Sequence, residues 1–215
     1  MKKRLTELVF ILDKSGSMGG LETDTIGGFN SMLKKQREER GECRVTTVLF
    51  DNRYTLLHDR IDIRAVAPIS EKEYFVGGST ALLDAIGRTI GKIAAVQKNT
   101  AEDYRAEKVI FIIITDGAEN ASREFSADEV KKLIEREKNR HGWEFLFLGA
   151  NIDAVETAGR FGIGADRAAE YVPDQAGTAL NYAVMSEAVS ELRSSGKMSA
   201  RHLDRIRRDR EKRGG

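Results

Sequence analysis

Two short apolar runs, each followed directly by an aspartate in a turn, constrain the fold of this chain most strongly. Leu8–Leu12 leads into Asp13, and the β-branched run Val109–Ile114 leads into Thr115-Asp116-Gly117. Continuous apolar runs of this length are typical of strands covered on both faces, as in a parallel sheet. Ligands of open α/β sheets bind beyond the carboxyl ends of such strands. If the two strands are neighbours, Asp13 and Asp116 meet there.

Oxygen-bearing side chains follow the first run at every second position. Asp13, Ser15 and Ser17 offer one carboxylate and two hydroxyls on a turn that contains Gly16. Mg²⁺ prefers oxygen ligands in near-octahedral geometry. Because hydroxyls do not cancel its charge, a cation held in this way retains Lewis acidity toward a further ligand. The alternative is that Asp13 and Ser15 only cap a helix after the strand.

A third segment, Gly77-Gly78-Ser79-Thr80, precedes a predicted helix. The glycines indicate a turn, and Ser79 or Thr80 can cap the helix that follows. A helix that starts at the same crevice would bring a hydroxyl to the cation. Taken singly, this segment is also consistent with a plain loop, and Thr115-Asp116-Gly117 with an ordinary turn.

Together these pieces resemble the von Willebrand factor A-type (VWA) domain with its metal-ion-dependent adhesion site. That family has Asp-x-Ser-x-Ser after the first strand, a Thr in a later loop and an Asp after the fourth strand. The resemblance extends over roughly residues 5–195, and the matching metal ligands are Asp13, Ser15, Ser17, Thr80 and Asp116. Ser79 is an alternative to Thr80, because it is an adjacent hydroxyl.

The resemblance also implies what this site holds. Mg²⁺, or alternatively Mn²⁺, would be bound directly by the two serines, with Thr80 joining or leaving and Asp116 often acting through water. One coordination position would remain for an Asp or Glu of a partner protein. Residues adjacent to the site in sequence are expected at its rim: Met18, Leu21, Glu22, Glu119, Asn120 and Asn151. For Met18, packing in the core is the alternative.

The alternation of strand and helix patterns predicts an α/β fold. We expect a doubly wound, mostly parallel central sheet with one antiparallel edge strand and helices on both faces. The predicted strands are 6–12, 45–50, 54–59, 108–114, 144–148 and 168–172, and the predicted helices are 21–40, 81–97, 126–140, 152–160 and 174–194. Gly27 and Gly28 weaken the first helix and are expected to allow close packing on the sheet.

The resemblance together with a change in charge predicts a VWA domain over residues 1–196 and a basic C-terminal tail, helical or disordered, over residues 197–215. The tail has eight Lys or Arg residues against three acids, so the remainder is acidic overall. One interpretation is a solvated helix or frayed tail. The other is a docking arm for an acidic partner, RNA or an anionic surface. No aromatic residue interleaves the charges, which argues against base stacking.

Composition limits the remaining classes. The net charge of +1 provides no global field for nucleic acid or a membrane, so neither is an expected partner. Cys43 is the only cysteine, which favours a reducing compartment. Lys2-Lys3-Arg4 precedes an apolar stretch too short for a secretory signal, and no run approaches the ~18 residues of a membrane span. We therefore expect a cytoplasmic protein, and the resemblance implies a VWA domain of bacterial type.

Several catalytic or binding motifs are missing from the sequence. His58, His141 and His202 are scattered and have no zinc-site spacing. No P-loop is present, and neither Ser15 nor Ser17 lies in a nucleophile elbow.

The leading hypothesis is a non-enzymatic, Mg²⁺-dependent protein-interaction module, whose partners, as the resemblance implies, include ATPases and stress-response complexes. A Mg²⁺-dependent phosphohydrolase is the competing class, because Asp13 after a strand is similar to the start of haloacid dehalogenase-like phosphatases. Ser15 replaces the second acid of that motif, so the general acid is missing. A nucleic-acid accessory protein acting through the basic tail is a third possibility.

Overall fold

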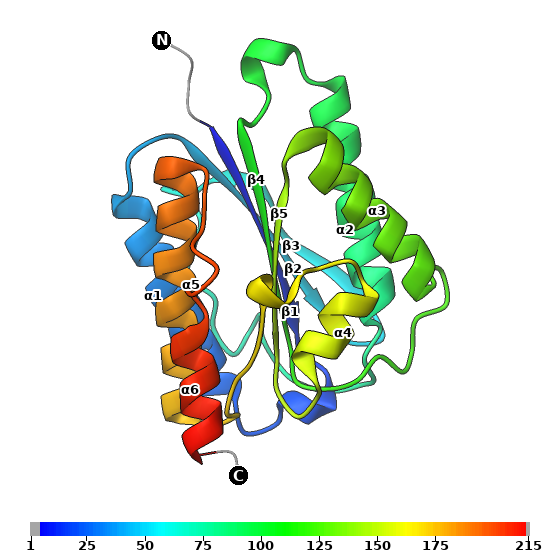
Figure 1. Cartoon of the computed structure of the whole chain (residues 1–215), viewed down its shortest axis with the longest axis vertical. Helices are drawn as coiled ribbons and strands as arrows, with labels where there is room; N and C mark the ends of the chain where they lie inside the picture. Colours follow the sequence, from blue (N-terminus) through cyan, green and yellow to red (C-terminus); the bar gives the residue numbers. More distant parts are fainter. Residues whose placement is uncertain (1–4, 214–215) are drawn as a thin grey trace.

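A six-stranded sheet runs through the centre of the computed structural model, which describes residues 5–213 (Figure 1). The strand order is β3-β2-β1-β4-β5-β6, and only the β2–β3 pair is antiparallel. The strands are β1 Thr6–Asp13, β2 Cys43–Phe50, β3 Tyr54–Asp62, β4 Lys108–Thr115, β5 Glu144–Gly149 and β6 Ala168–Glu170. The expected doubly wound fold is confirmed. Lys2-Lys3-Arg4, considered above as a signal segment, lies outside the described residues, as do residues 214–215.

Helices cover both faces of the sheet (Figure 1). One face carries α1 Glu22–Glu38, α5 Gln175–Ser195 and α6 Asp204–Arg213, and the other carries α2 Leu82–Asn99, α3 Ala127–His141 and α4 Ala154–Arg160. Short 3₁₀ turns span Gly16–Met18, Glu102–Tyr104 and Ala165–Arg167. Along β1, alternate residues enter the two apolar clusters, because successive strand side chains point to opposite faces. Among residues 5–213 no helix combines the length and apolarity needed to cross a bilayer.

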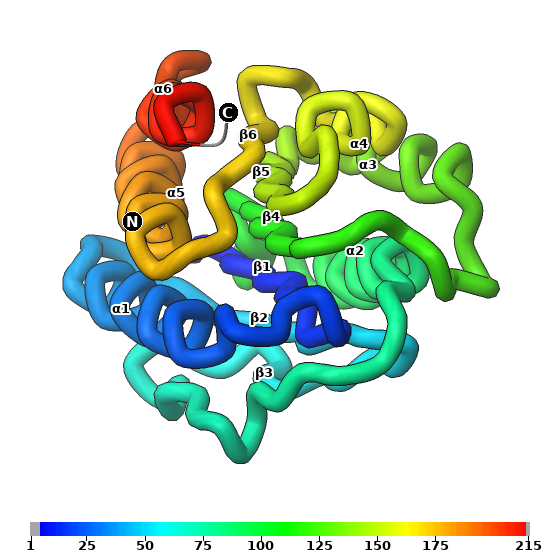
Figure 2. The backbone as a smooth tube through the Cα atoms, turned by 90° about the horizontal axis from the view of Figure 1, so that it is seen from below, coloured from blue at the N-terminus to red at the C-terminus, as the bar shows by residue number. Residues whose placement is uncertain are grey.

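The strand order reverses at β1, which pairs with β2 on one side and β4 on the other. Leu12 lies opposite Ile114 in the parallel β1–β4 register. The chain segments that leave these two strands therefore start side by side at one edge of the sheet, the edge formed by the carboxyl ends of the parallel strands. Figure 2 views the molecule from this edge. A reversal of this kind creates the crevice in which open α/β sheets bind ligands.

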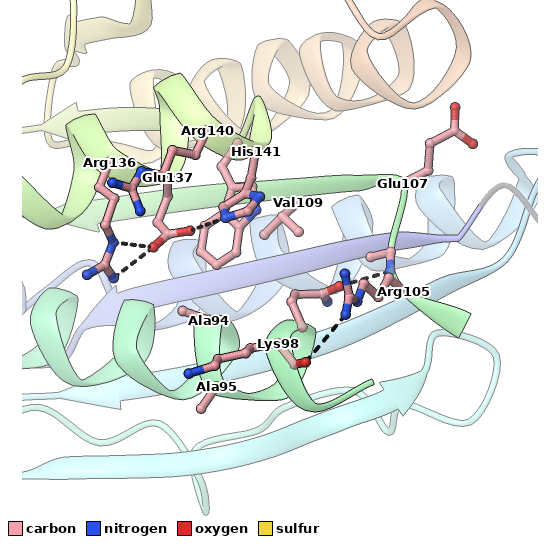
Figure 3. Close-up of a pocket in the computed structure, with 13 residues that line it drawn as sticks. Ala94, Ala95, Lys98, Arg105, Glu107, Val109, Arg136, Glu137, Arg140 and His141 are labelled. Atoms are coloured by element: carbon pink, nitrogen blue, oxygen red, sulfur yellow. Dashed lines mark hydrogen bonds and ion pairs between the residues drawn. The ribbon is translucent and has the colours of Figure 1, made fainter. Parts of the chain in front are cut away.

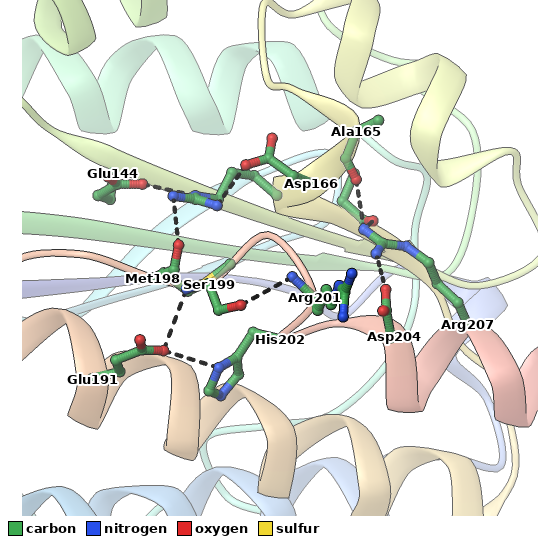
Figure 4. A network of polar contacts seen from close by, with 12 residues as sticks. Glu144, Ala165, Asp166, Glu191, Met198, Ser199, Arg201, His202, Asp204 and Arg207 are labelled. Atoms are coloured by element: carbon green, nitrogen blue, oxygen red, sulfur yellow. Dashed lines mark hydrogen bonds and ion pairs between the residues drawn. The ribbon is translucent and has the colours of Figure 1, made fainter.

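Residues 197–213 fold back onto the domain. Leu203 and Ile206 are buried in the same apolar cluster as α5. Arg207 donates to the carbonyl oxygens of Ala165 (2.6 Å) and Ala168 (2.8 Å), so that α6 covers the β6 edge (Figure 4). Other arginines of this segment pair with acids of the domain: Arg205 with Glu187, Arg210 with Glu170 and Arg213 with Asp174.

Close packing of α1 occurs at Gly28. A Cβ atom at Gly28 would lie 2.2 Å from the Tyr182 ring on α5, whereas a Cβ at the adjacent Gly27 would meet no atom within 4 Å. The expected close approach thus exists, but its neighbour is α5 rather than the sheet. Gly28 admits the aromatic ring between the two helices.

This pair of glycines offers a matched test. Gly28→Ala is expected to lower the free energy of unfolding by about 1–3 kcal/mol, because the new methyl group collides with Tyr182. Gly27→Ala should raise it by about 0.5–1 kcal/mol through helix propensity alone. Urea denaturation of both variants measures the difference. Equal effects of the two substitutions would contradict the packing described here.

Candidate metal site

Two buried carboxylates occupy the crevice beyond β1 and β4. Asp13 ends β1 and is 1% exposed, and Asp116 follows β4 and is 2% exposed. Burial raises the pKa of Asp13, against hydrogen bonds from Ser15 and Thr115 that lower it. Burial also raises the pKa of Asp116; the Asn151 side chain opposes this shift, and the negative charge of Asp13 adds to it. The crevice therefore disfavours two uncompensated anions, and either a proton or a cation between them would relieve this cost.

Three hydroxyl groups surround the same crevice. The Oγ atoms of Ser15 and Ser17 lie 3.0 Å apart. A Cβ atom built on Gly117 would lie 2.9 Å from Ser17 Oγ and 3.7 Å from Thr80 Oγ1, so both hydroxyls face the same glycine. Thr80 is buried whereas Ser79 is exposed, which favours Thr80 as the site hydroxyl.

The loop before α2 is attached to the loop after β4. Asn120 Oδ1 accepts from Thr80 N (2.9 Å), and the Thr80 carbonyl accepts from Asn120 N (3.0 Å). The expected helix cap by Ser79 or Thr80 is wrong: Ala81 occupies the N-cap position without a side-chain cap. Instead, Glu119 accepts from Leu83 N (2.8 Å). The Thr80 hydroxyl consequently remains available to the crevice.

Further side chains hold the two aspartates. The sequence interpretation placed Asn151 at the rim and Thr115 in a turn without this role, and it did not name Tyr74. Thr115 Oγ1 donates to Asp13 Oδ2 (2.6 Å), and Tyr74 donates its hydroxyl to the Asp13 carbonyl. Asn151, at positive φ after β5, donates its side-chain amide to Asp116. Thr115 ends β4, and Asn151 lies just after β5. Their positions at the carboxyl ends of central strands could have indicated that they lie near the site. No sequence pattern links Tyr74 to Asp13.

Lys14 turns away from the crevice, toward an acid. Its Nζ lies 2.6 Å from Asp51 Oδ2 and 4.7 Å from the centre of the Phe75 ring. The ion pair is almost buried and fixes the loop after β1 against the β2–β3 turn. Phe75 itself is 61% exposed, so an apolar ring lies on the surface beside the site.

The expected rim is partly wrong. Met18 and Leu21 are buried in the core cluster and present no surface to a partner. Glu119 and Asn120 make the loop contacts described above, Asn151 binds Asp116, and Glu22 accepts from Gly20 N (2.7 Å). These four side chains are at least partly exposed, so the structure contradicts the expected rim only at Met18 and Leu21.

The donor set suits a hard divalent cation. The only potential donor atoms in the side chains of the five proposed residues are oxygens, which Mg²⁺ and Mn²⁺ prefer. Within the described part of the chain no group of three or more His, Cys, Asp or Glu side chains could hold a metal. A cation here would thus rely on hydroxyls as well as on Asp13 and Asp116. The Ser17 and Thr80 hydroxyls lie close to Gly117, where a Cβ would obstruct them; we call this arrangement the Gly117 cradle, and it agrees with such a site.

Neither a protein-family model nor a curated protein matches the sequence. Solved structures do match the fold. The D319A mutant of the PilB minor pilin from Streptococcus sanguinis has a TM-score of 0.60 at 12% identity, covering 87% of this chain and 62% of that one. The mussel byssus protein PTMP1, with a zinc-occupied MIDAS motif, has a TM-score of 0.57 at 13% identity, covering 86% and 46%.

A von Willebrand factor type A protein from Catenulispora acidiphila matches with a TM-score of 0.57 at 16% identity, covering 86% of this chain and 42% of that one. This chain therefore has the VWA-type α/β fold. It spans less than two thirds of the length of each of these three proteins.

A substitution at Gly117 tests whether the close approach of the Ser17 and Thr80 hydroxyls to this glycine supports cation binding. Gly117→Ala is expected to displace the Ser17 hydroxyl and to weaken divalent-cation binding by at least about tenfold, a loss typical of disturbed ligand shells. Thermal stability without metal should change little, because Ser17 is exposed. Isothermal titration with MgCl₂ measures the affinity. Gly77→Ala is the control, since its Cβ would meet no atom within 4 Å; equal affinities of the two variants would contradict the cradle.

Proposed function

We propose that this protein is a non-enzymatic interaction module that binds an acidic side chain of a partner protein through a divalent cation, Mg²⁺ or Mn²⁺. Asp13, Ser15, Ser17, Thr80 and Asp116 would hold the cation. The observation that carries this proposal is the convergence of two buried carboxylates, both with raised pKa, and neutral hydroxyls at one edge of the sheet.

The chemistry of the donors supports an acidic ligand. Asp13 and Asp116 together supply at most two negative charges, and the hydroxyls supply none. When bound, the cation provides a charge-dense acceptor for an external carboxylate. Thr115 and Asn151 keep the two aspartates oriented toward the crevice. Desolvated charge contacts of this kind can dominate the affinity of an interface.

Phe75 provides an apolar contact next to the proposed charged centre. Its ring is 61% exposed and lies against Lys14, whose neighbours Asp13 and Ser15 belong to the site. Aromatic residues, including Phe, are enriched in protein–protein interfaces relative to the rest of the surface. We therefore place Phe75 inside the partner interface, directly beside the charged centre.

Three observations argue against the other candidate functions. Ser15 takes the position of the second acid in the phosphatase motif. The three histidines lie elsewhere: His58 contacts Thr47, His141 ends α3 and His202 pairs with Glu191. In the basic tail, Arg205, Arg207, Arg210 and Arg213 already bind the domain, which leaves fewer cations for nucleic acid. We therefore favour binding over catalysis and a protein partner over nucleic acid.

Candidate partners are bacterial cytoplasmic assemblies such as ATPases or stress-response complexes. Affinity capture from bacterial lysate, with MgCl₂ or with EDTA, would identify them. A partner retained by the wild type in MgCl₂ and lost both in EDTA and with Asp116→Ala would meet the proposal. Partners that bind equally under all three conditions would contradict it.

Metal-dependent melting tests the site directly. Saturating MgCl₂, at a hundredfold excess over Kd, should stabilise the fold by about 2.7 kcal/mol. For a chain of this size the midpoint should rise by roughly 5–10 °C. Asp116→Ala is expected to abolish the rise, because it removes one of the two carboxylates. Asp103→Ala, an exposed acid before β4, should retain it; a wild type that does not respond to Mg²⁺ or Mn²⁺ would refute the metal site.

Phe75→Ala should weaken capture of the metal-dependent partner by at least about tenfold, the loss typical of a central aromatic contact. Its melting response to MgCl₂ should equal that of the wild type, because Phe75 is not one of the proposed ligands of the metal ion. Tyr104→Ala is the matched control, since Tyr104 is 65% exposed but precedes β4 at the opposite edge. Surface plasmon resonance with the captured partner gives both affinities. Equal losses of partner affinity in the two variants would contradict the placement of Phe75 in the interface.

A further inference from the structure

A cavity lies at the edge of the sheet formed by the amino ends of the strands, opposite the proposed metal site. It has a volume of about 560 Å³ and opens near the amino ends of β4 and β5, between the C-terminal halves of α2 and α3 (Figure 3). Asp13 and Asp116 lie beyond the carboxyl ends of the strands, so this cavity is separate from the proposed metal site. Its volume falls within the range of roughly 300–1,000 Å³ found for pockets that bind small organic molecules.

The floor of the cavity is formed by a stacked, largely buried aromatic ring. Trp143 lines it and stacks on Phe111, with ring centres 5.6 Å apart and an interplanar angle of 19°. Gly142, in the left-handed conformation at φ 63°, ends α3 and directs the chain back to β5. Val109 and Ala94 add further apolar surface. A pre-formed floor of this kind can accept a flat apolar group with little loss of conformational entropy.

Cations surround this floor. Lys98 on α2 and Arg140 on α3 both line the cavity, and neither has a carboxylate partner within residues 5–213. Arg105 lines it as well, and its guanidinium donates to the Thr100 carbonyl (2.7 Å) rather than to an acid. The positive charge of these three side chains is therefore not neutralised by ion pairs.

The acids of the cavity do not balance these cations. Glu137 is buried and is bound by Arg136 at 2.8 Å, so its charge is already compensated. The Glu107 side chain extends away from the other lining side chains (Figure 3). The cavity thus combines an apolar aromatic floor with an excess of positive charge, which favours an anion over a neutral molecule.

We propose that this cavity binds a small amphipathic organic anion, with a flat apolar body of one or two rings and a carboxylate, sulfonate or phosphate group. The body would lie against Trp143, and the anionic group would lie between Lys98 and Arg140. This site is independent of the metal site and of any partner bound there.

The protein contains its own reporter, because Trp143 is the only tryptophan in the chain. Titration with 8-anilinonaphthalene-1-sulfonate should quench Trp143 emission saturably, in EDTA as well as in MgCl₂. The neutral analogue N-phenyl-1-naphthylamine should bind at least about tenfold more weakly, since it lacks the anionic group. Loss of sulfonate binding in EDTA would contradict a site separate from the metal site.

Variants distinguish this site from adventitious dye binding. The double variant Lys98→Gln, Arg140→Gln should raise the Kd of the sulfonate about tenfold. Lys132→Gln, an exposed lysine on α3 that does not line the cavity, should leave it unchanged. Ala94→Met, which fills the cavity, should abolish quenching by both probes while thermal melting confirms a folded chain. Absence of saturable quenching, equal affinity for the neutral probe, or equal Kd values in the double variant and the control would overturn the proposal.

Discussion

Parallel pairing of β1 with β4 is the constraint on which the candidate metal site depends. The register places Leu12 beside Ile114, so the segments that follow leave the sheet side by side. Asp13 and Asp116 are more than a hundred residues apart in sequence, and no local interaction could bring them together. Burial of the apolar runs on both faces of the sheet stabilises this pairing. The cost of desolvating two carboxylates is thereby imposed by the core.

The surrounding loops offset part of this cost. Ser15 N and Thr115 Oγ1 donate to Asp13, and the Asn151 amide donates to Asp116. The raised pKa values indicate that these hydrogen bonds do not compensate for burial completely. The remaining imbalance is the physical reason why a cation would bind, and it is consistent with neutral rather than anionic side chains at positions 15, 17 and 80.

The edge formed by the carboxyl ends of the parallel strands and the edge formed by their amino ends have opposite electrostatic character. The carboxyl edge gathers buried acids and hydroxyls, which favour a cation, whereas the cavity at the amino edge gathers cations around Trp143, which favour an anion. This separation follows from which loops meet at each edge: strand ends and the α2 start at one, the ends of α2 and α3 at the other. The small net charge of +1 therefore conceals two strongly polarised regions.

Apolar periodicity by itself determined the order and type of the strands and of helices α1 to α5, because alternating and helical spacings of buried residues distinguish the two kinds of element. It left α6 open between a helix and a disordered tail. The spacing Asp13-x-Ser15-x-Ser17 likewise predicted an oxygen-rich turn. Only the tertiary structure decided that Thr80 rather than Ser79 faces the crevice, that Met18 and Leu21 are core residues, and that Gly28 accommodates Tyr182. The cavity beside Trp143 also arises only in the folded chain. These features depend on contacts between segments distant in sequence, and local pattern carries no information about such contacts.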